Sequence, residues 1–122
     1  MATTWDVRNG RAHWNGRPLR DWVDELVAEV VDELDPVSVW MLGSVARGDE
    51  GPDSDIDLLV VLRSFSPTDV LALKRHVHER TTVPVPFDIA FTDPDRFLRR
   101  SKVAGTLERA AVREGRCVYD RG

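Results

Sequence analysis

Three aspartates on two candidate strands are the residues of this sequence best suited to do chemistry. Asp55 and Asp57 stand two residues apart at the start of an apolar run that ends at Leu62. Because successive side chains of a strand point to opposite faces, both carboxylates should lie on one face, about 7 Å apart along the chain. Two carboxylates this close raise each other's pKa unless a cation separates them. The pair therefore favours Mg²⁺, which prefers oxygen ligands.

The third aspartate, Asp88, interrupts another apolar segment, residues 85–91. Its neighbours Phe87 and Ile89 are expected in the core, so its carboxylate should emerge on the opposite face of the strand. If this strand lies beside the one that carries Asp57, the three acids converge. Three carboxylates can hold two Mg²⁺ ions about 4 Å apart, which bridge triphosphate oxygens and the attacking hydroxyl of an in-line displacement.

The phosphate end of such a site requires hydrogen-bond donors, and the turn at Gly43 and Ser44 is a candidate. Gly43 lets the backbone approach phosphate closely, and Ser44 can begin a short helix to Arg47 whose free amides favour an anion. Arg47 could donate to phosphate oxygens, or it could pair with Asp49 or Glu50; the sequence leaves both open.

Each part of this constellation also has an ordinary structural interpretation. An Asp-x-Asp pair on a strand is more often a polar edge than a metal site, and Asp88 alone would pass as an acid of an edge strand. The combination favours chemistry because all its parts serve one reaction. His76 and His78 do not form a rival site, since their rings would point about 200° apart on a helix. No P-loop motif follows Gly43.

The elements that must position these residues can be predicted from apolar spacing. Two Asn-Gly pairs, at residues 9–10 and 15–16, indicate a small hairpin or irregular turns, with Trp5 and Trp14 expected to cap the core. The expected order that follows is a helix over residues 18–34, strands over 37–42 and 55–62, a helix from 67 to about 80 with Ser66 as its cap, a strand over 85–91, a helical region over 94–114 that breaks near Ser101, and a strand over 116–119. This order predicts an α/β (α+β) fold, a small mixed β-sheet with helices packed on it.

Length and composition predict one domain over residues 1–122, of which 1–17 form an extension of open role. No apolar run approaches the roughly 20 residues of a membrane helix, so a cytoplasmic protein is expected. The net charge of −4 argues against binding of long nucleic acid. From Asp93 onward eight basic residues face five acidic ones, as in a solvated helix face or a surface for an acidic partner. The single cysteine, Cys117, is expected to be a buried small hydrophobe.

The string Gly43-Ser44, ten residues, Asp55-Ile56-Asp57 resembles the signature of the polymerase-β-like nucleotidyltransferases. The fuller strings Gly-Ser-Val-Ala-Arg-Gly and Ser-Asp-Ile-Asp-Leu-Leu-Val resemble their minimal prokaryotic branch, the MNT domains. The match covers residues 39–61 and extends more loosely to Asp88. The resemblance implies the nucleotidyltransferase fold, Gly43 and Ser44 at the triphosphate, Asp55 and Asp57 as ligands of both metals, and Asp88 as ligand of the metal that activates the acceptor and as a candidate general base. It also implies ATP as donor.

Members of the MNT branch are commonly antitoxins paired with a helical HEPN ribonuclease, which some of them silence by attaching AMP to a tyrosine. The resemblance therefore implies transfer of AMP to a protein acceptor, with a HEPN-type toxin or a second copy of the chain completing the acceptor surface. Two alternatives remain: an antitoxin of the same fold that acts by binding alone, and a nucleotidyltransferase that modifies a small molecule such as an antibiotic. The stretch from Trp5 to Arg17 has no counterpart in this resemblance.

Overall fold

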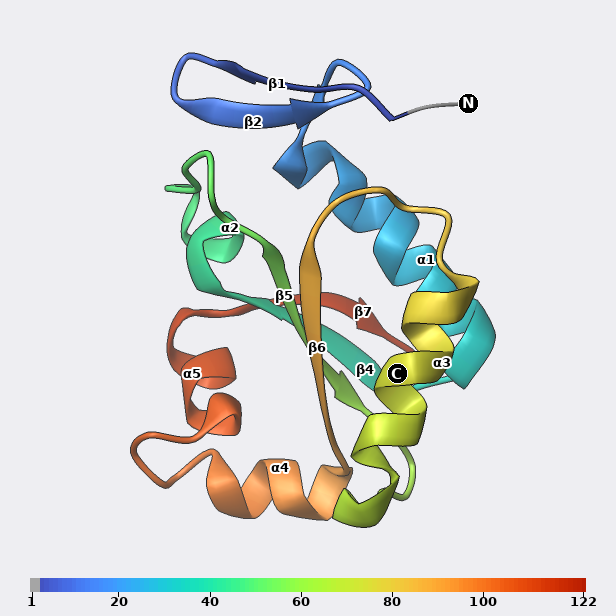
Figure 1. Ribbon diagram of the computed structural model, residues 1–122. Coiled ribbons are helices and arrows are strands. Elements are labelled where there is room, and N and C mark those ends of the chain that lie inside the picture. Colours follow the sequence, from blue (N-terminus) through green and yellow to red (C-terminus); the bar gives the residue numbers. More distant parts are fainter. Residues whose placement is uncertain (1–2) are drawn as a thin grey trace.

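The computed structural model describes residues 3–122, which form a central sheet with helices on both faces and a small N-terminal sheet (Figure 1). The central sheet has the strand order β6-β5-β4-β7. Its strands are β4 (Ser38–Leu42), β5 (Ile56–Val61), β6 (Phe87–Thr92) and β7 (Arg116–Asp120). Strand β4 is antiparallel to both β5 and β7, whereas β5 and β6 are parallel. The mixed sheet expected from the sequence is therefore confirmed.

One face of the central sheet carries the main hydrophobic core. Helices α1 (Val23–Leu34) and α3 (Val70–Arg80) cover this face (Figure 1). Alternate residues of the strands point toward these helices because side chains of a strand alternate between faces. The buried core residues on the strands are Val39, Met41, Ile56, Leu58, Val60, Ile89 and Phe91.

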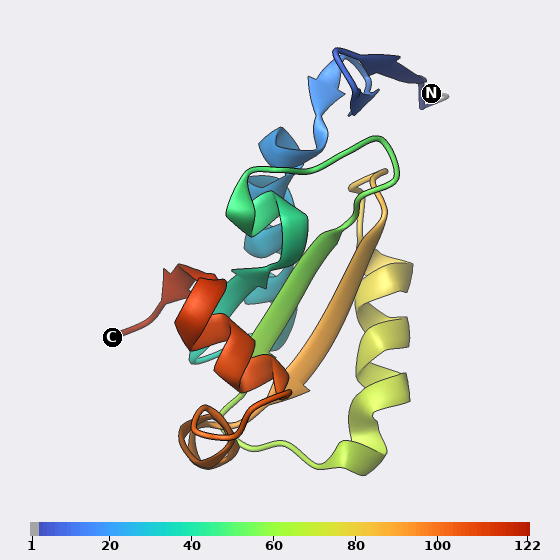
Figure 2. The same ribbon diagram turned by 90° about the vertical axis from the view of Figure 1, so that its left-hand side faces the viewer.

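The other face of the central sheet is covered only in part. Its helices are α4 (Pro94–Arg100) and α5 (Leu107–Glu114). Ala111 of α5 is buried against Leu42 and Leu59, and Phe97 of α4 packs on this cluster. Both helices lie toward the carboxyl-terminal ends of β5 and β6, so the beginnings of these strands are left open on this face (Figure 2). This open area is the place where the candidate acids emerge.

The N-terminal sheet confirms the expected hairpin. Its strands are β1 (Trp5–Arg8), β2 (Arg11–Trp14) and β3 (Arg17–Pro18), in sequence order. Both Asn-Gly pairs have positive φ at each residue, as two-residue hairpin turns of type I′ require. Trp14 is buried, but Trp5 is 57% exposed, so the expectation that both tryptophans cap the core is wrong for Trp5. The first two residues of the expected 1–17 extension lie outside the described residues.

The first long helix begins later than its apolar spacing predicts. Pro18 belongs to β3, and a 3₁₀ turn, η1 (Leu19–Trp22), leads into α1. The helix ends where Asp35 adopts the left-handed conformation ahead of Pro36, which cannot continue a helix. Asp93 and Thr106 cap α4 and α5 by accepting hydrogen bonds from backbone amides, which explains the break predicted near Ser101.

Two further expectations are corrected. Helix α3 follows a 3₁₀ turn, η2 (Pro67–Asp69), and Ser66 makes no capping hydrogen bond with its side chain, which contacts Thr68 instead. Cys117 lies on the edge strand β7 and is exposed rather than buried. Across residues 3–122, no helix combines the length and apolarity needed to cross a membrane.

Candidate functional site

Asp57 of β5 and Asp88 of β6 are register partners in the parallel pair of strands. Partners in register point to the same face of a sheet, and here it is the face that α4 and α5 leave open. The flanking Ile56 and Ile89 are fully buried on the other face. The expectation that Asp88 is directed away from the core is confirmed, and the condition that the two acid-bearing strands are neighbours is met.

Negative charge accumulates around Asp57. Its pKa is raised from 3.8 to about 6, first by burial and then by the charge of Asp55, a hydrogen bond with Asp55 and the charge of Asp88. Arg47 acts in the opposite direction and lowers the pKa. Asp55 stands just before β5, which begins at Ile56. Asp55 and Asp88, the other two sequence-predicted acids, thus both act on the carboxyl group of Asp57.

Gly43 allows Asp57 to occupy its position. It is the first residue of the short helix α2 (Gly43–Arg47), which follows β4 directly and starts one residue earlier than expected. A Cβ built on Gly43 would collide with Asp57 Oδ2 and stand 3.3 Å from its Cγ. Gly43 also has a φ of 72°, a region that L-residues adopt only under strain. Two independent constraints therefore require glycine here.

Ser44 and Arg47, the second and fifth residues of α2, both contact Asp49. The carbonyl of Ser44 accepts a hydrogen bond of 3.0 Å from the amide of Asp49. Arg47 Nε lies 3.3 Å from Asp49 Oδ2, in an exposed pair of the kind that contributes about 0–1 kcal/mol. Arg47 therefore takes the second of its two expected roles, the pairing with Asp49, and its charge also lowers the pKa of Asp57. Glu50, the other expected partner of Arg47, pairs with Arg20 instead.

Lys74 of α3 is a residue of the site that sequence analysis missed. Its Nζ lies 3.5 Å from Asp88 Oδ1, an oxygen that also accepts a hydrogen bond of 3.0 Å from the Ile89 amide. The available signal was the place of Lys74 on the sheet-facing stripe of its helix, four residues after Val70 and three before Val77. The cation that pairs with Asp88 thus comes from a helix on the core side of the sheet.

The donor set of the three acids fits a divalent metal ion. It consists of carboxylate oxygens, which Mg²⁺ prefers. The pKa of Asp57 is raised first by burial and then by the nearby Asp55 and Asp88, and a bound cation would offset both effects. In the present side-chain conformations, no three Asp, Glu, His or Cys residues within 3–122 are grouped closely enough to hold one ion. Asp88 is the acid already engaged by a cation, that of Lys74.

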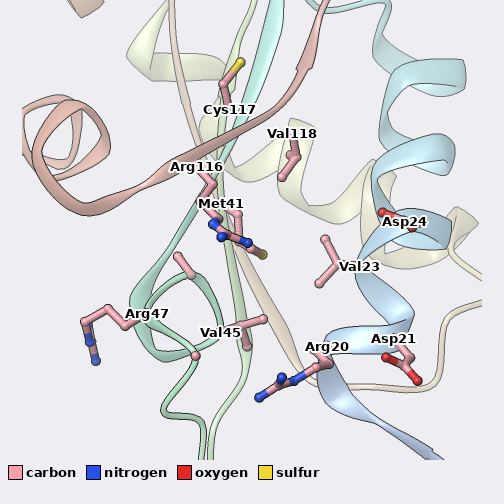
Figure 3. Close-up of a pocket in the computed structure, with 12 residues that line it drawn as sticks. Arg20, Asp21, Val23, Asp24, Met41, Val45, Arg47, Arg116, Cys117 and Val118 are labelled. Atoms are coloured by element: carbon pink, nitrogen blue, oxygen red, sulfur yellow. The ribbon is translucent and has the colours of Figure 1, made fainter.

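The structure contains a cavity of about 800 Å³ (Figure 3). It is lined by η1 and the start of α1, by α2 and by β7, with Met41 of the main core at its floor. Arg116 of β7 points toward its interior, whereas Arg47 points away from it (Figure 3). None of the three aspartates lines it, although Arg47, whose charge acts on Asp57, does.

Comparisons with known proteins show which family and fold this chain belongs to. The sequence profile of the family described as "nucleotidyltransferase domain" matches residues 23–113, more than half of the chain. Among solved structures, the chain is similar to a protein from Sulfolobus solfataricus that is provisionally described as a nucleotidyltransferase, with a TM-score of 0.56 and 21% identity over 84% of this chain and 81% of that one. This second likeness shows the fold. A search of curated proteins gives no significant match. The chain belongs to the nucleotidyltransferase domain family and has its fold.

Proposed function

We propose that this protein uses divalent metal to transfer AMP from ATP to a hydroxyl group of a protein acceptor. Family membership supports the general reaction, transfer of a nucleoside monophosphate from a nucleoside triphosphate. One observation carries the proposal furthest. Asp57 has Asp88 as its register partner and Asp55 as its charged neighbour, and burial together with these two acids raises its pKa to about 6. This arrangement is unfavourable without a cation and suits one that holds phosphate.

Each site residue has a role in this proposal. Asp55 and Asp57 hold the metal on the open face of the sheet, and Asp88 stands on the acceptor side, where it accepts the proton of the attacking hydroxyl. When bound, two Mg²⁺ ions would neutralise phosphate charge and lower the pKa of that hydroxyl. The backbone at Gly43 and Ser44 faces the triphosphate, and Arg47 supplies a further donor to its oxygens. The acceptor oxygen bonds to the α-phosphorus while the bond to pyrophosphate breaks.

A protein acceptor is the finer part of the proposal. It is supported by the likeness of residues 39–61 to MNT domains, whose members commonly act on a partner protein. Helices α4 and α5 leave the beginnings of β5 and β6 uncovered (Figure 2), and the side chain of Asp88 is 65% exposed, so an acceptor side chain could approach it. A HEPN-type toxin is the partner that this likeness favours, and the protein would then be its antitoxin.

The deciding experiment uses ATP labelled at the α-phosphate, Mg²⁺ and the product of the adjacent gene. We expect label on the acceptor with the wild-type protein and none with the double variant Asp55→Asn, Asp57→Asn. Asp53→Asn is the matched control, because Asp53 is an exposed acid two residues before the pair. If the double variant still neutralises the partner, the protein acts by binding alone. Label on a small molecule but on no protein would instead indicate the small-molecule activity.

A further inference from the structure

Glu50 is a buried acid in a surface loop. The loop runs from Gly48 to Ser54 and joins helix α2 to the acid-bearing strand β5. Its other residues are exposed or half-buried, but Glu50 is only 4% exposed. A buried carboxylate requires compensation by hydrogen bonds and opposite charge. The residue that compensates the charge of Glu50 therefore shows which part of the protein anchors the loop.

Arg20 of η1 provides that compensation with both arms of its guanidinium. Its Nε donates to Glu50 Oε2 at 2.7 Å, and its Nη2 donates to Oε1 at 2.9 Å. Burial alone would raise the pKa of Glu50, but hydrogen bonds from Arg20 and from its own backbone, with the charges of Arg20 and Arg11, lower it below its usual value. The pair is therefore ionic at neutral pH, and its forked geometry fixes orientation as well as distance.

A second contact ties the same loop to the N-terminal sheet. Arg11 of β2 donates from Nη2 to the carbonyl of Gly48 at 3.4 Å. The N-terminal sheet lies next to this loop, at the end of the central sheet where β5 begins (Figure 1). Residues 11 and 20 thus hold the loop at two points, and both precede residue 23, where the match to the family profile begins.

The position of Asp55 depends on where this loop ends. Asp55 precedes β5, so it is outside the ladder of hydrogen bonds that fixes Asp57. Gly51 and Pro52 lie between Glu50 and Asp55, together with two small polar residues. Glu50 is buried in this pair, whereas the side chain of Arg20 is 41% exposed. Because the cost of desolvating a buried charge offsets much of the attraction in such a pair, its value is better explained by the conformation that it selects.

We propose that the pair of Arg20 and Glu50 is a positioning device for the catalytic centre, which fixes the Gly48–Ser54 loop so that Asp55 stands beside Asp57. This inference rests on the proposed function. The inference also assigns a role to the N-terminal segment: its residues Arg11 and Arg20 hold the Gly48–Ser54 loop in place. Neither Arg20 nor Glu50 touches the nucleotide; both act through Asp55.

The test uses two variants and one matched control. Glu50→Gln removes the charge of the acid, and Arg20→Lys keeps a cation but loses the fork. Glu25→Gln is the control, since it breaks the exposed pair with Arg17 in the same part of the chain and leaves the loop alone. Mn²⁺ and ATP binding are measured by calorimetry well below each melting temperature, with hydrogen exchange of the loop amides in the metal-free protein.

We expect Mn²⁺ binding about tenfold to a hundredfold weaker in Glu50→Gln, the range typical when a group that orients a metal ligand is removed. Arg20→Lys should give a smaller loss, and Glu25→Gln none. Exchange of the amides over residues 48–55 should accelerate in the two variants only. Should Glu50→Gln fail to fold, Arg20→Lys gives the same comparison.

Two negative results are distinguishable. If the folded variants melt earlier but bind Mn²⁺ and ATP as the wild type does, the pair is merely structural and this inference is overturned alone. If the wild type binds neither ligand, and Asp57→Asn makes no difference, the proposed function is overturned and this inference with it.

Discussion

Gly43 and Asp57 are packed so closely that a Cβ on residue 43 would occupy the space of the Asp57 carboxylate. We therefore expect Gly43→Ala to displace Asp57 and to reduce nucleotide transfer about a hundredfold, the size of effect that a misplacement of 1 Å can have. The left-handed backbone of Gly43 adds a stability cost of roughly 1–2 kcal/mol. Labelled AMP transfer and thermal melting measure the two effects.

Gly48→Ala separates strain from collision. Gly48 has a similar φ of 80°, but a Cβ there would meet no atom within 4 Å. Both substitutions should lower stability by similar amounts, and only Gly43→Ala should lose transfer. Equal activity in the two variants would show that the contact with Asp57 is unimportant.

Asp57→Asn should make the metal-free protein more stable at neutral pH. The folded protein keeps the Asp57 proton up to about pH 6, whereas an unfolded chain releases it near 3.8. Between these values the folded state binds more protons, so the contribution of this group to stability falls as pH rises from about 4 to 6. Asparagine cannot ionise, so in chelator the variant should melt above the wild type near pH 7 and together with it below about pH 4.

The control for this prediction is Asp53→Asn, which removes an exposed acid of the preceding loop. It should leave the melting temperature nearly unchanged at both pH values. Mg²⁺ should then raise the melting temperature of the wild type and of Asp53→Asn, but not that of Asp57→Asn. An Asp57→Asn protein that melts below the wild type near pH 7 would contradict the charge accumulation described above.

The sequence predicts the direction of a site side chain well where that direction depends only on neighbouring residues, because side chains of a strand alternate between the two faces of the sheet. Phe87 and Ile89 flank Asp88, and this alone directs its carboxylate out of the core. Residue spacing cannot predict which strands are neighbours in the sheet. Only the structure shows that β5 and β6 are adjacent and that Asp57 and Asp88 are register partners. The resemblance to a nucleotidyltransferase signature was what made that adjacency reasonable.

Contacts between distant segments could not be predicted. Lys74 reaches Asp88 across fourteen residues and Arg20 reaches Glu50 across thirty, and no periodicity relates either pair. Edge positions were also misjudged, since Trp5 and Cys117 lie on strands at the margins of their sheets and remain exposed despite their apolar character. Residue type predicts burial only when the position of the strand within its sheet is known.

Lys74→Met should strengthen metal binding by roughly threefold. The ammonium group of Lys74 neutralises Asp88 at 3.5 Å and repels a nearby divalent ion. Because both groups are partly exposed, the effect is expected within the range of about 0.2–1 kcal/mol found for solvent-screened pairs. Calorimetry with Mn²⁺ measures it. Arg75→Met is the control, since Arg75 is an exposed cation on the same helix; weaker binding in Lys74→Met than in Arg75→Met would show that Lys74 supports the metal.

Glu108→Ala should destabilise the fold without altering the acids. Glu108 is 4% exposed and accepts hydrogen bonds from Thr92 Oγ1 at 2.9 Å and from Arg100 Nε at 3.1 Å, so it joins α5 to β6 and α4. Removing one partner of a buried network leaves others unsatisfied, at a cost of about 2–4 kcal/mol. Urea unfolding should show this loss, while the folded variant should bind Mn²⁺ as the wild type does. The exposed Glu114, on the same helix, provides the control Glu114→Ala, which should change neither quantity. Weakened Mn²⁺ binding in folded Glu108→Ala would mean that α4 and α5 help to position the acids, which the open face above them argues against.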